Sequence, residues 1–101
     1  MEVEKIQAKI RNGEYRFSDH AVKKMIERAI NRTDVEDALL AGEIIERYPR
    51  DKYSPSCLIY GKTKKGRHIH VQISLPPRVV IITAYEPDPN LWVEDFSKRK
   101  N

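Results

Sequence analysis

The hydrophobic period of this chain changes once, near Glu43, and this change limits the folds that the chain can adopt. Before Glu43, apolar residues recur every three or four positions, as on one face of an α-helix. After Glu43, apolar and polar residues alternate, as in β-strands. The 101 residues suffice for a single core, so we expect residues 1–101 to form one domain. Helices and strands in separate blocks predict an α+β fold with helices gathered on one side of a sheet.

Three helices are expected before the change of period. Residues 2–12 have apolar positions at helical spacing, and Gly13 suits the left-handed conformation that commonly ends a helix. Ser18 is a good N-cap for a second helix, because its hydroxyl can accept a hydrogen bond from a free backbone N–H. Residues 33–36, Thr-Asp-Val-Glu, fit the capping-box pattern of a third helix, which Gly42 closes.

The strands after the change of period are joined by short segments rich in Pro, Gly and Lys, which predict an antiparallel meander. The expected strands are Glu43–Tyr48, Ser56–Thr63, Arg67–Leu75 and Arg78–Glu86, with Tyr15–Phe17 as a brief edge strand. In the tail after the last strand, Trp92 and Phe96 are four residues apart, a spacing that would let them pack as one helical turn.

Two of these strands carry side chains suited to a functional site. Alternation in Arg67–Leu75 separates the apolar Ile69, Val71 and Ile73 from the polar His68, His70, Gln72 and Ser74. In Arg78–Glu86, the odd positions Val79, Ile81, Thr83 and Tyr85 are expected to share a face. In a meander, we expect His70 and Tyr85 to approach the helix that carries His20.

The expected helix after Ser18 has a cationic stripe. At about 100° per residue, His20, Lys24 and Arg28 fall on one side of it, opposite an apolar stripe. These charges could instead be the solvated face of an amphipathic helix. Likewise, His68 and His70 could be exposed sheet residues, and Tyr85 a packed aromatic. A zinc site is the weaker interpretation of His68 and His70, because no carboxylate or cysteine stands at a confirming spacing, so no metal or cofactor is expected.

The composition favours a protein without a membrane span. Lys and Arg number 19 against 15 Asp and Glu, and the net charge of +4 is compatible with a phosphate-bearing partner. Cys57 is the only cysteine, so no disulfide can form within the chain. The charged start does not resemble a signal peptide, and the longest apolar run is far too short to cross a bilayer. We therefore expect a cytoplasmic protein.

Several short motifs, taken together, resemble one known family. The motifs are His20-Ala21, Met25, Glu27-Arg28-x-Ile30, Asp34-Val35, Gly42-Glu43-Ile44, His70-Val71 and Val80-Ile81-Ile82-Thr83-x-Tyr85. With them, the chain resembles domain of unknown function 4258, a family similar to the RelE/ParE toxin superfamily. The resemblance covers about Phe17 to Trp92, within a family-like core of about residues 15–96. Members usually carry Arg at the position of Lys24 and Gly at that of Ala29.

The resemblance implies both a fold and a role. The fold is that of RelE-like toxins, with two helices packed on a four-stranded antiparallel sheet, to which residues 2–12 add an N-terminal helix. Members are often encoded beside a small zinc-finger antitoxin of the MqsA or YgiT type. The implied partners are therefore RNA, including mRNA on the ribosome, and such an antitoxin.

These observations lead to one hypothesis about function and one alternative. The hypothesis is a metal-independent endoribonuclease that acts on mRNA as the toxin of a toxin–antitoxin pair. His20 and His70 would be base and acid in either order, Arg28 would stabilise the transition state, and Tyr85 would orient the substrate or replace the acid. The expected phosphate-binding residues are Lys23, Lys24, Arg67 and His68. The alternative is a non-catalytic RNA- or protein-binding domain of the same fold.

Overall fold

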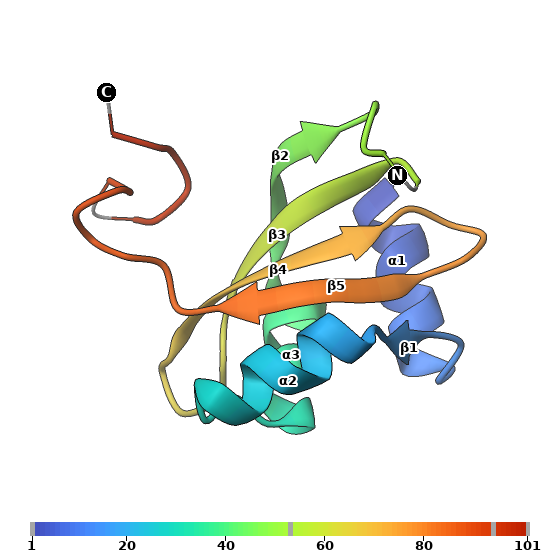
Figure 1. Cartoon of the computed structure of the whole chain (residues 1–101), viewed down its shortest axis with the longest axis horizontal. Helices are drawn as coiled ribbons and strands as arrows, with labels where there is room; N and C mark the ends of the chain where they lie inside the picture. The colour runs from blue at the N-terminus through green and yellow to red at the C-terminus, as the bar shows by residue number, and fades with distance from the viewer. Residues whose placement is uncertain (1, 53, 94, 101) are drawn as a thin grey trace.

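The computed structural model describes residues 2–52, 54–93 and 95–100. Three helices and five strands follow one another in the order α1, β1, α2, α3, β2, β3, β4, β5 (Figure 1). Their bounds are α1 Glu2–Arg11, β1 Arg16–Phe17, α2 Asp19–Glu27, α3 Arg32–Ala41, β2 Glu43–Tyr48, β3 Ser56–Lys62, β4 His68–Ser74 and β5 Val80–Tyr85. The α+β class is therefore confirmed, and no helix in the described part of the chain is long and apolar enough to cross a membrane.

The sheet has five strands and is mixed, which corrects the expected four-stranded antiparallel sheet. Its order is β1-β5-β4-β3-β2, and strands β2 to β5 pair as antiparallel neighbours. The short strand β1 is parallel to β5, with Arg16 beside Val80. The backbone N–H of Ser18 donates to the carbonyl of Ile81 at 2.9 Å, so the segment of β1 provides hydrogen-bond partners for backbone groups on the outer edge of β5.

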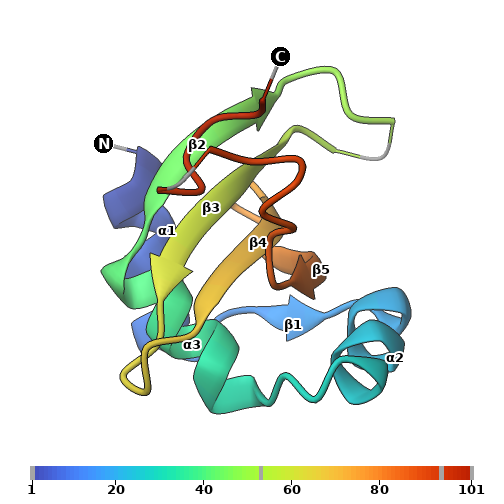
Figure 2. The same ribbon diagram turned by 90° about the vertical axis from the view of Figure 1, so that its left-hand side faces the viewer.

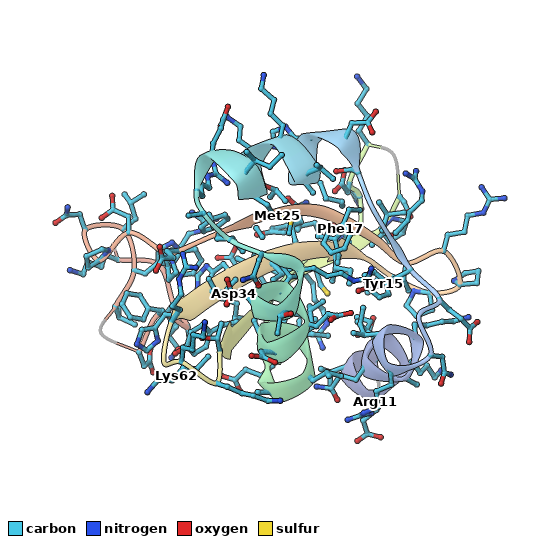
Figure 3. The ribbon with its side chains drawn as sticks, turned by 90° about the horizontal axis from the view of Figure 1, so that it is seen from below. Arg11, Tyr15, Phe17, Met25, Asp34 and Lys62 are labelled. Carbon is cyan, nitrogen blue, oxygen red and sulfur yellow. The ribbon has the colours of Figure 1, made fainter. Side chains whose placement is uncertain are left out.

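All three helices bury apolar side chains in one core against the same side of the sheet (Figure 3). Ile6 from α1, Met25 from α2 and Leu39 from α3 meet Val71 of β4 and Ile81 of β5 in this core. Alternation along β4 is borne out, because Ile69, Val71 and Ile73 belong to this core, whereas the even-numbered residues of the strand do not. The side of the sheet that carries the even-numbered residues of β4 therefore faces away from the helices.

The helix ends follow the expected chemistry, with one correction. The Ser18 hydroxyl accepts a hydrogen bond from the N–H of Ala21 at 3.0 Å, which confirms the N-cap of α2. Gly13 has φ +71 after α1, as expected. The capping box of α3, however, joins Asn31 and Asp34 rather than the predicted residues 33–36. Each side chain accepts a hydrogen bond from the other residue's backbone N–H, at 2.8 and 3.1 Å, so the helix begins two residues earlier.

A β-bulge corrects the predicted face of Tyr85. Thr83 lies beside Gln72 and Ile81 beside Ile73, so Ile82 is an extra residue in β5. Val79 and Ile81 accordingly face the core, as does Ala84. Tyr85 lies beside His70 on the opposite side of the sheet, together with Thr83. The four odd positions of this strand therefore do not share one face.

The C-terminal segment, residues 88–93 and 95–100, lies over the side of the sheet that the helices leave open (Figure 2). Trp92 is 2% exposed, and its ring contacts the ring of His70. The expected helical turn between Trp92 and Phe96 is wrong for the described residues, which contain no helix after β5. Trp92 instead forms an isolated antiparallel bridge with Arg99.

Candidate functional site

His70 is fully buried on β4, between Tyr60 of β3 and Tyr85 of β5. Its Nε2 atom lies 2.8 Å from the backbone carbonyl oxygen of Phe96, and its Nδ1 atom lies 3.4 Å from the hydroxyl of Tyr85. A carbonyl oxygen can only accept, so Nε2 carries the hydrogen in a neutral ring. Nδ1 is then an acceptor, and the Tyr85 hydroxyl is its donor. The hydrogen bonds thus assign one tautomer of His70.

Burial controls the protonation of this pair. The pKa of His70 is lowered, mainly because burial penalises the imidazolium, while the hydrogen bond to Phe96 and the charge of Glu46 act in the opposite direction. The pKa of the Tyr85 hydroxyl is raised, mainly by burial. Near neutral pH, the pair is therefore a neutral imidazole beside a neutral phenol.

Tyr85 borders an open pocket of about 530 Å³, here called the tyrosine pocket. Its lining residues are Arg28, Tyr85, Glu86, Asp88, Leu91, Trp92 and Arg99. Arg28 is exposed, and one of its Nη atoms donates to the carbonyl of Ala84 at 2.9 Å. The guanidinium of Arg99 lies 4.7 Å from the centre of the Trp92 ring and pairs with Glu46 at 2.8 Å. The pocket thus combines two held guanidinium groups and a tyrosine side chain with the carboxylates of Glu86 and Asp88, and the guanidinium groups can bind a phosphodiester.

Of the predicted catalytic residues, the structure brings together Arg28, His70 and Tyr85, but not His20. Arg28 and Tyr85 line the tyrosine pocket, and His70 lies directly behind Tyr85. His20, at the start of α2, borders a different pocket that shares no described lining residue with the first. The predicted pairing of His20 with His70 as acid and base therefore has no geometric support.

The predicted phosphate-binding residues are mostly engaged elsewhere. Lys24 forms an ion pair with Glu27 at 3.2 Å, whereas Lys23 is exposed. His68 Nδ1 lies 2.7 Å from the Tyr60 hydroxyl, and the two rings are stacked. Within the described residues, no group of three or more His, Cys, Asp or Glu side chains is arranged to hold a metal ion.

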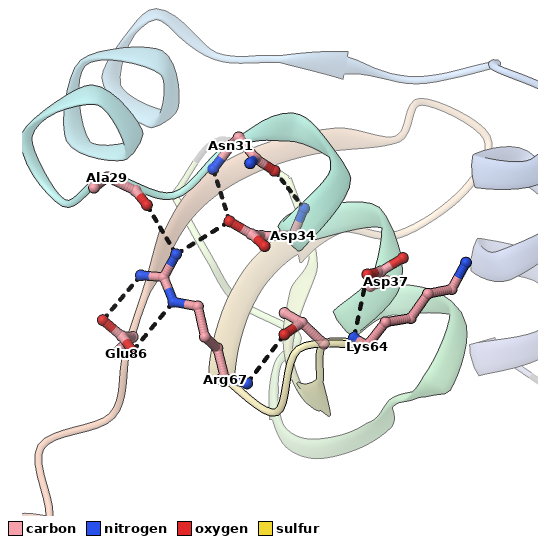
Figure 4. A network of polar contacts seen from close by, with 8 residues as sticks. Ala29, Asn31, Asp34, Asp37, Lys64, Arg67 and Glu86 are labelled. Atoms are coloured by element: carbon pink, nitrogen blue, oxygen red, sulfur yellow. Dashed lines mark hydrogen bonds and ion pairs between the residues drawn. The ribbon is translucent and has the colours of Figure 1, made fainter.

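Arg67 is a structural residue in this fold (Figure 4). Its guanidinium pairs with the buried carboxylate of Asp34 at 3.1 Å and with Glu86 at 3.0 Å, and it donates to the carbonyl of Ala29 at 2.8 Å. These contacts join the start of β4 to the turn between α2 and α3 and to the end of β5. Because both carboxylates and a carbonyl occupy the guanidinium, Arg67 is poorly suited to bind phosphate.

Sequence reasoning missed the residues that complete the site from other elements. Arg99 and Trp92 come from the C-terminal segment, and Glu46 comes from β2. Trp92 was expected to pack against Phe96 as one apolar residue of a polar tail, but not to line a site. Nothing in the run Lys98-Arg99-Lys100 distinguishes the arginine that pairs with Glu46 from its neighbours.

Comparison with known families gives the same family as the sequence motifs. A family model described as domain of unknown function 4258 (DUF4258) matches residues 17–86, well over half of the chain. The chain belongs to this family. The part matched by the DUF4258 model includes Arg28, His70 and Tyr85, but not α1 or the segment that supplies Trp92 and Arg99. No curated protein and no solved structure gives a significant match to this DUF4258 chain.

Proposed function

We propose that this DUF4258 protein is an endoribonuclease that cleaves mRNA with side chains of the tyrosine pocket. The observation that carries the proposal is the arrangement of Tyr85, whose hydroxyl donates to the Nδ1 atom of buried His70 and whose side chain lines a pocket with Arg28 and Arg99. Cleavage of RNA through its 2′-hydroxyl needs a proton acceptor, a proton donor and cationic stabilisation of the phosphorane. This pocket can supply all three.

In the proposed reaction, the 2′-oxygen attacks the adjacent phosphorus while the Tyr85 oxygen takes the 2′ proton. A phenol with a raised pKa is already protonated at neutral pH, so Tyr85 can accept this proton only by releasing its own. His70 Nδ1 is placed to receive that proton and becomes imidazolium. The relay then runs in reverse, and Tyr85 protonates the departing 5′-oxygen, which leaves a 2′,3′-cyclic phosphate.

The cations act on the charge that develops at phosphorus. Arg28 and Arg99 are each fixed by a contact on one side, to the Ala84 carbonyl and to Glu46 respectively. A fixed guanidinium stabilises a phosphorane at a lower reorganisation cost than a mobile one. In this scheme, Tyr85 and the two arginines contact the substrate, while His70 acts through Tyr85.

The biological role that we propose is that of the toxin in a toxin–antitoxin pair. Its support is the resemblance of the motifs around His20, Arg28 and Tyr85 to relatives of the RelE/ParE toxins, and the net charge of +4, which suits an RNA substrate. The partner in this proposal is a small zinc-finger antitoxin.

A non-catalytic RNA-binding domain is the second candidate. It is favoured by the burial of His70, since a fully buried histidine that bonds to Phe96 and contacts Trp92 also has a structural use. Under this alternative, Arg28 and Arg99 would bind phosphate without turnover.

Growth of cells that express the chain from an inducible promoter separates the two candidates. We expect growth arrest with new RNA ends for the wild type, and neither effect for Arg28→Gln. The matched control is Arg11→Gln, which removes the same charge from exposed Arg11 at the end of α1 and should behave like the wild type. Normal growth with intact RNA, in cells that contain folded protein, would reject the ribonuclease and retain the binding domain.

A further inference from the structure

A second pocket, of about 560 Å³, lies beside strands β1 and β5 and is separate from the tyrosine pocket. We call it the β1–β5 pocket. Its lining residues include Arg16, Asp51, Arg78, Val80 and Ile82. The volume lies within the usual range for pockets that hold small organic ligands. The proposed cleavage of RNA uses none of these residues.

The cationic side of the β1–β5 pocket has free binding capacity. Arg16 and Arg78 are exposed, and neither guanidinium forms an ion pair or hydrogen bond with any described residue. They differ in this respect from Arg28, Arg67 and Arg99, each of which is held by a partner. The pairing of β1 with β5 sets Arg16 beside Val80, two residues after Arg78, so the two guanidinium groups belong to one edge of the sheet. Two arginines with free donors that line the same pocket favour a phosphate group.

The remaining walls of the β1–β5 pocket suit a base and a sugar. Val80 and Ile82 lie partly exposed in it, and they form an aliphatic surface on which a flat ring can pack. Asp51 is fixed there, because its Oδ2 atom accepts hydrogen bonds from Ser56 at 2.7 Å and from Gln72 at 3.1 Å. Its Oδ1 atom accepts none from the described residues, which leaves an acceptor for a ribose hydroxyl or an exocyclic amine.

We propose that the β1–β5 pocket binds one nucleoside monophosphate unit. The phosphate lies between Arg16 and Arg78, the base packs on Val80 and Ile82, and Asp51 accepts a hydrogen bond from the ribose or the base. The unit is a residue of the RNA substrate, so the pocket is a second subsite that positions RNA relative to the tyrosine pocket. That assignment of the source rests on the proposed function, whereas the chemistry of the pocket does not.

The test is a titration of the full chain, followed by amide chemical shifts, with AMP, UMP, adenosine, inorganic phosphate and a short single-stranded RNA. We expect both mononucleotides to shift amides of the β1–β5 pocket, and to bind at least about tenfold more tightly than adenosine or phosphate. The double variant Arg16→Gln with Arg78→Gln should lose at least about tenfold in affinity for AMP. The variant Arg11→Gln with Lys5→Gln, which removes the same charge from exposed positions of α1, should bind AMP as the wild type does.

Each outcome decides one part of the proposal. Equal affinity for phosphate and AMP, or shifts that do not involve the pocket, would overturn the nucleotide site. If short RNA binds more tightly than AMP and loses affinity in the double variant, the bound nucleotide unit is part of an RNA. If short RNA and AMP bind with equal affinity, RNA is overturned as the source of the unit, and the pocket is a site for free nucleotides. Loss of cleavage in Tyr85→Phe with AMP binding retained is the expected result. If the wild type binds AMP but never cleaves RNA, the ribonuclease proposal fails and the pocket stands.

Discussion

Ala29 adopts a backbone conformation that its side chain disfavours. Its φ is +53, directly after the end of α2. The N–H of Ile30 donates to the carbonyl of Met25 at 2.9 Å, and the N–H of Ala29 donates to the carbonyl of Ile26 at 3.3 Å. These two bonds form a Schellman motif, in which the residue at the position of Ala29 is usually glycine. The chain thus carries a small local strain beside Arg28, which lines the tyrosine pocket.

Replacement of Ala29 by Gly should therefore stabilise the protein. The strain that glycine relieves in the folded state is larger than the entropic cost of ordering the more flexible residue. The free energy of unfolding should therefore rise by roughly 0.5 to 1 kcal/mol. Urea denaturation measures this change. The control is Ala8→Gly, at an exposed position within α1, which should lower the same free energy by about 1 kcal/mol. A destabilised Ala29→Gly would show that the motif is not strained.

His70 should make stability depend on pH. Its pKa is lowered in the folded protein from the ordinary value of 6.5, so below that value the unfolded chain binds a proton more readily than the folded chain. The contribution of neutral His70 to the free energy of unfolding is fully present above about pH 6.5, and it is lost as the pH falls through the pKa of the folded protein. We expect His70→Gln to lose this part of the pH dependence. Urea denaturation of both proteins at several pH values tests it, and parallel curves would contradict the buried neutral histidine.

Among the elements, α3 and β3 are in unusually close contact at Gly61. A Cβ atom added to Gly61 would lie 1.9 Å from the carbonyl oxygen of Ala38, so a larger residue would have to separate the helix from the strand. Gly61→Ala should therefore lower the free energy of unfolding by about 3 kcal/mol. Gly13→Ala is the matched control, since a Cβ there meets nothing within 4 Å. It should cost only about 1 kcal/mol, because of its positive φ, and a similar loss in both variants would contradict the contact.

The helices and long strands were predictable because their signals are local. The apolar period, the Ser18 cap and Gly13 each depend on residues within a few positions. The parallel pairing of β1 with β5 and the bulge at Ile82 depend instead on contacts between segments far apart in sequence. For the same reason, the predicted face of Tyr85 was wrong. Alternation assigns faces only while pairing is regular, and one extra residue reverses them.

At the scale of the whole molecule, different elements pack on the two sides of the sheet. The helices cover one side with a continuous apolar core, and the C-terminal segment covers part of the other through Trp92 and Arg99. The candidate site lies where that segment meets the end of β5. The sequence made Arg28, His70 and Tyr85 candidates, but it could not place Arg28 and Tyr85 in one pocket with His70 behind Tyr85, or separate His20 from them. The positions of these residues relative to one another depend on the register of β4 with β5 and on the path of the C-terminal segment.

We propose that Tyr85 cleaves RNA with the help of His70, and in vitro cleavage of an mRNA by the purified protein is the measurement that addresses this mechanism without the cell. We compare the wild type with Tyr85→Phe, and with Tyr15→Phe, which removes a hydroxyl that donates to Glu36 of α3. We expect 2′,3′-cyclic phosphate ends from the wild type and Tyr15→Phe, and a rate at least about a hundredfold lower for Tyr85→Phe. Equal rates for all three proteins, or no cleavage by the folded wild type, would contradict it.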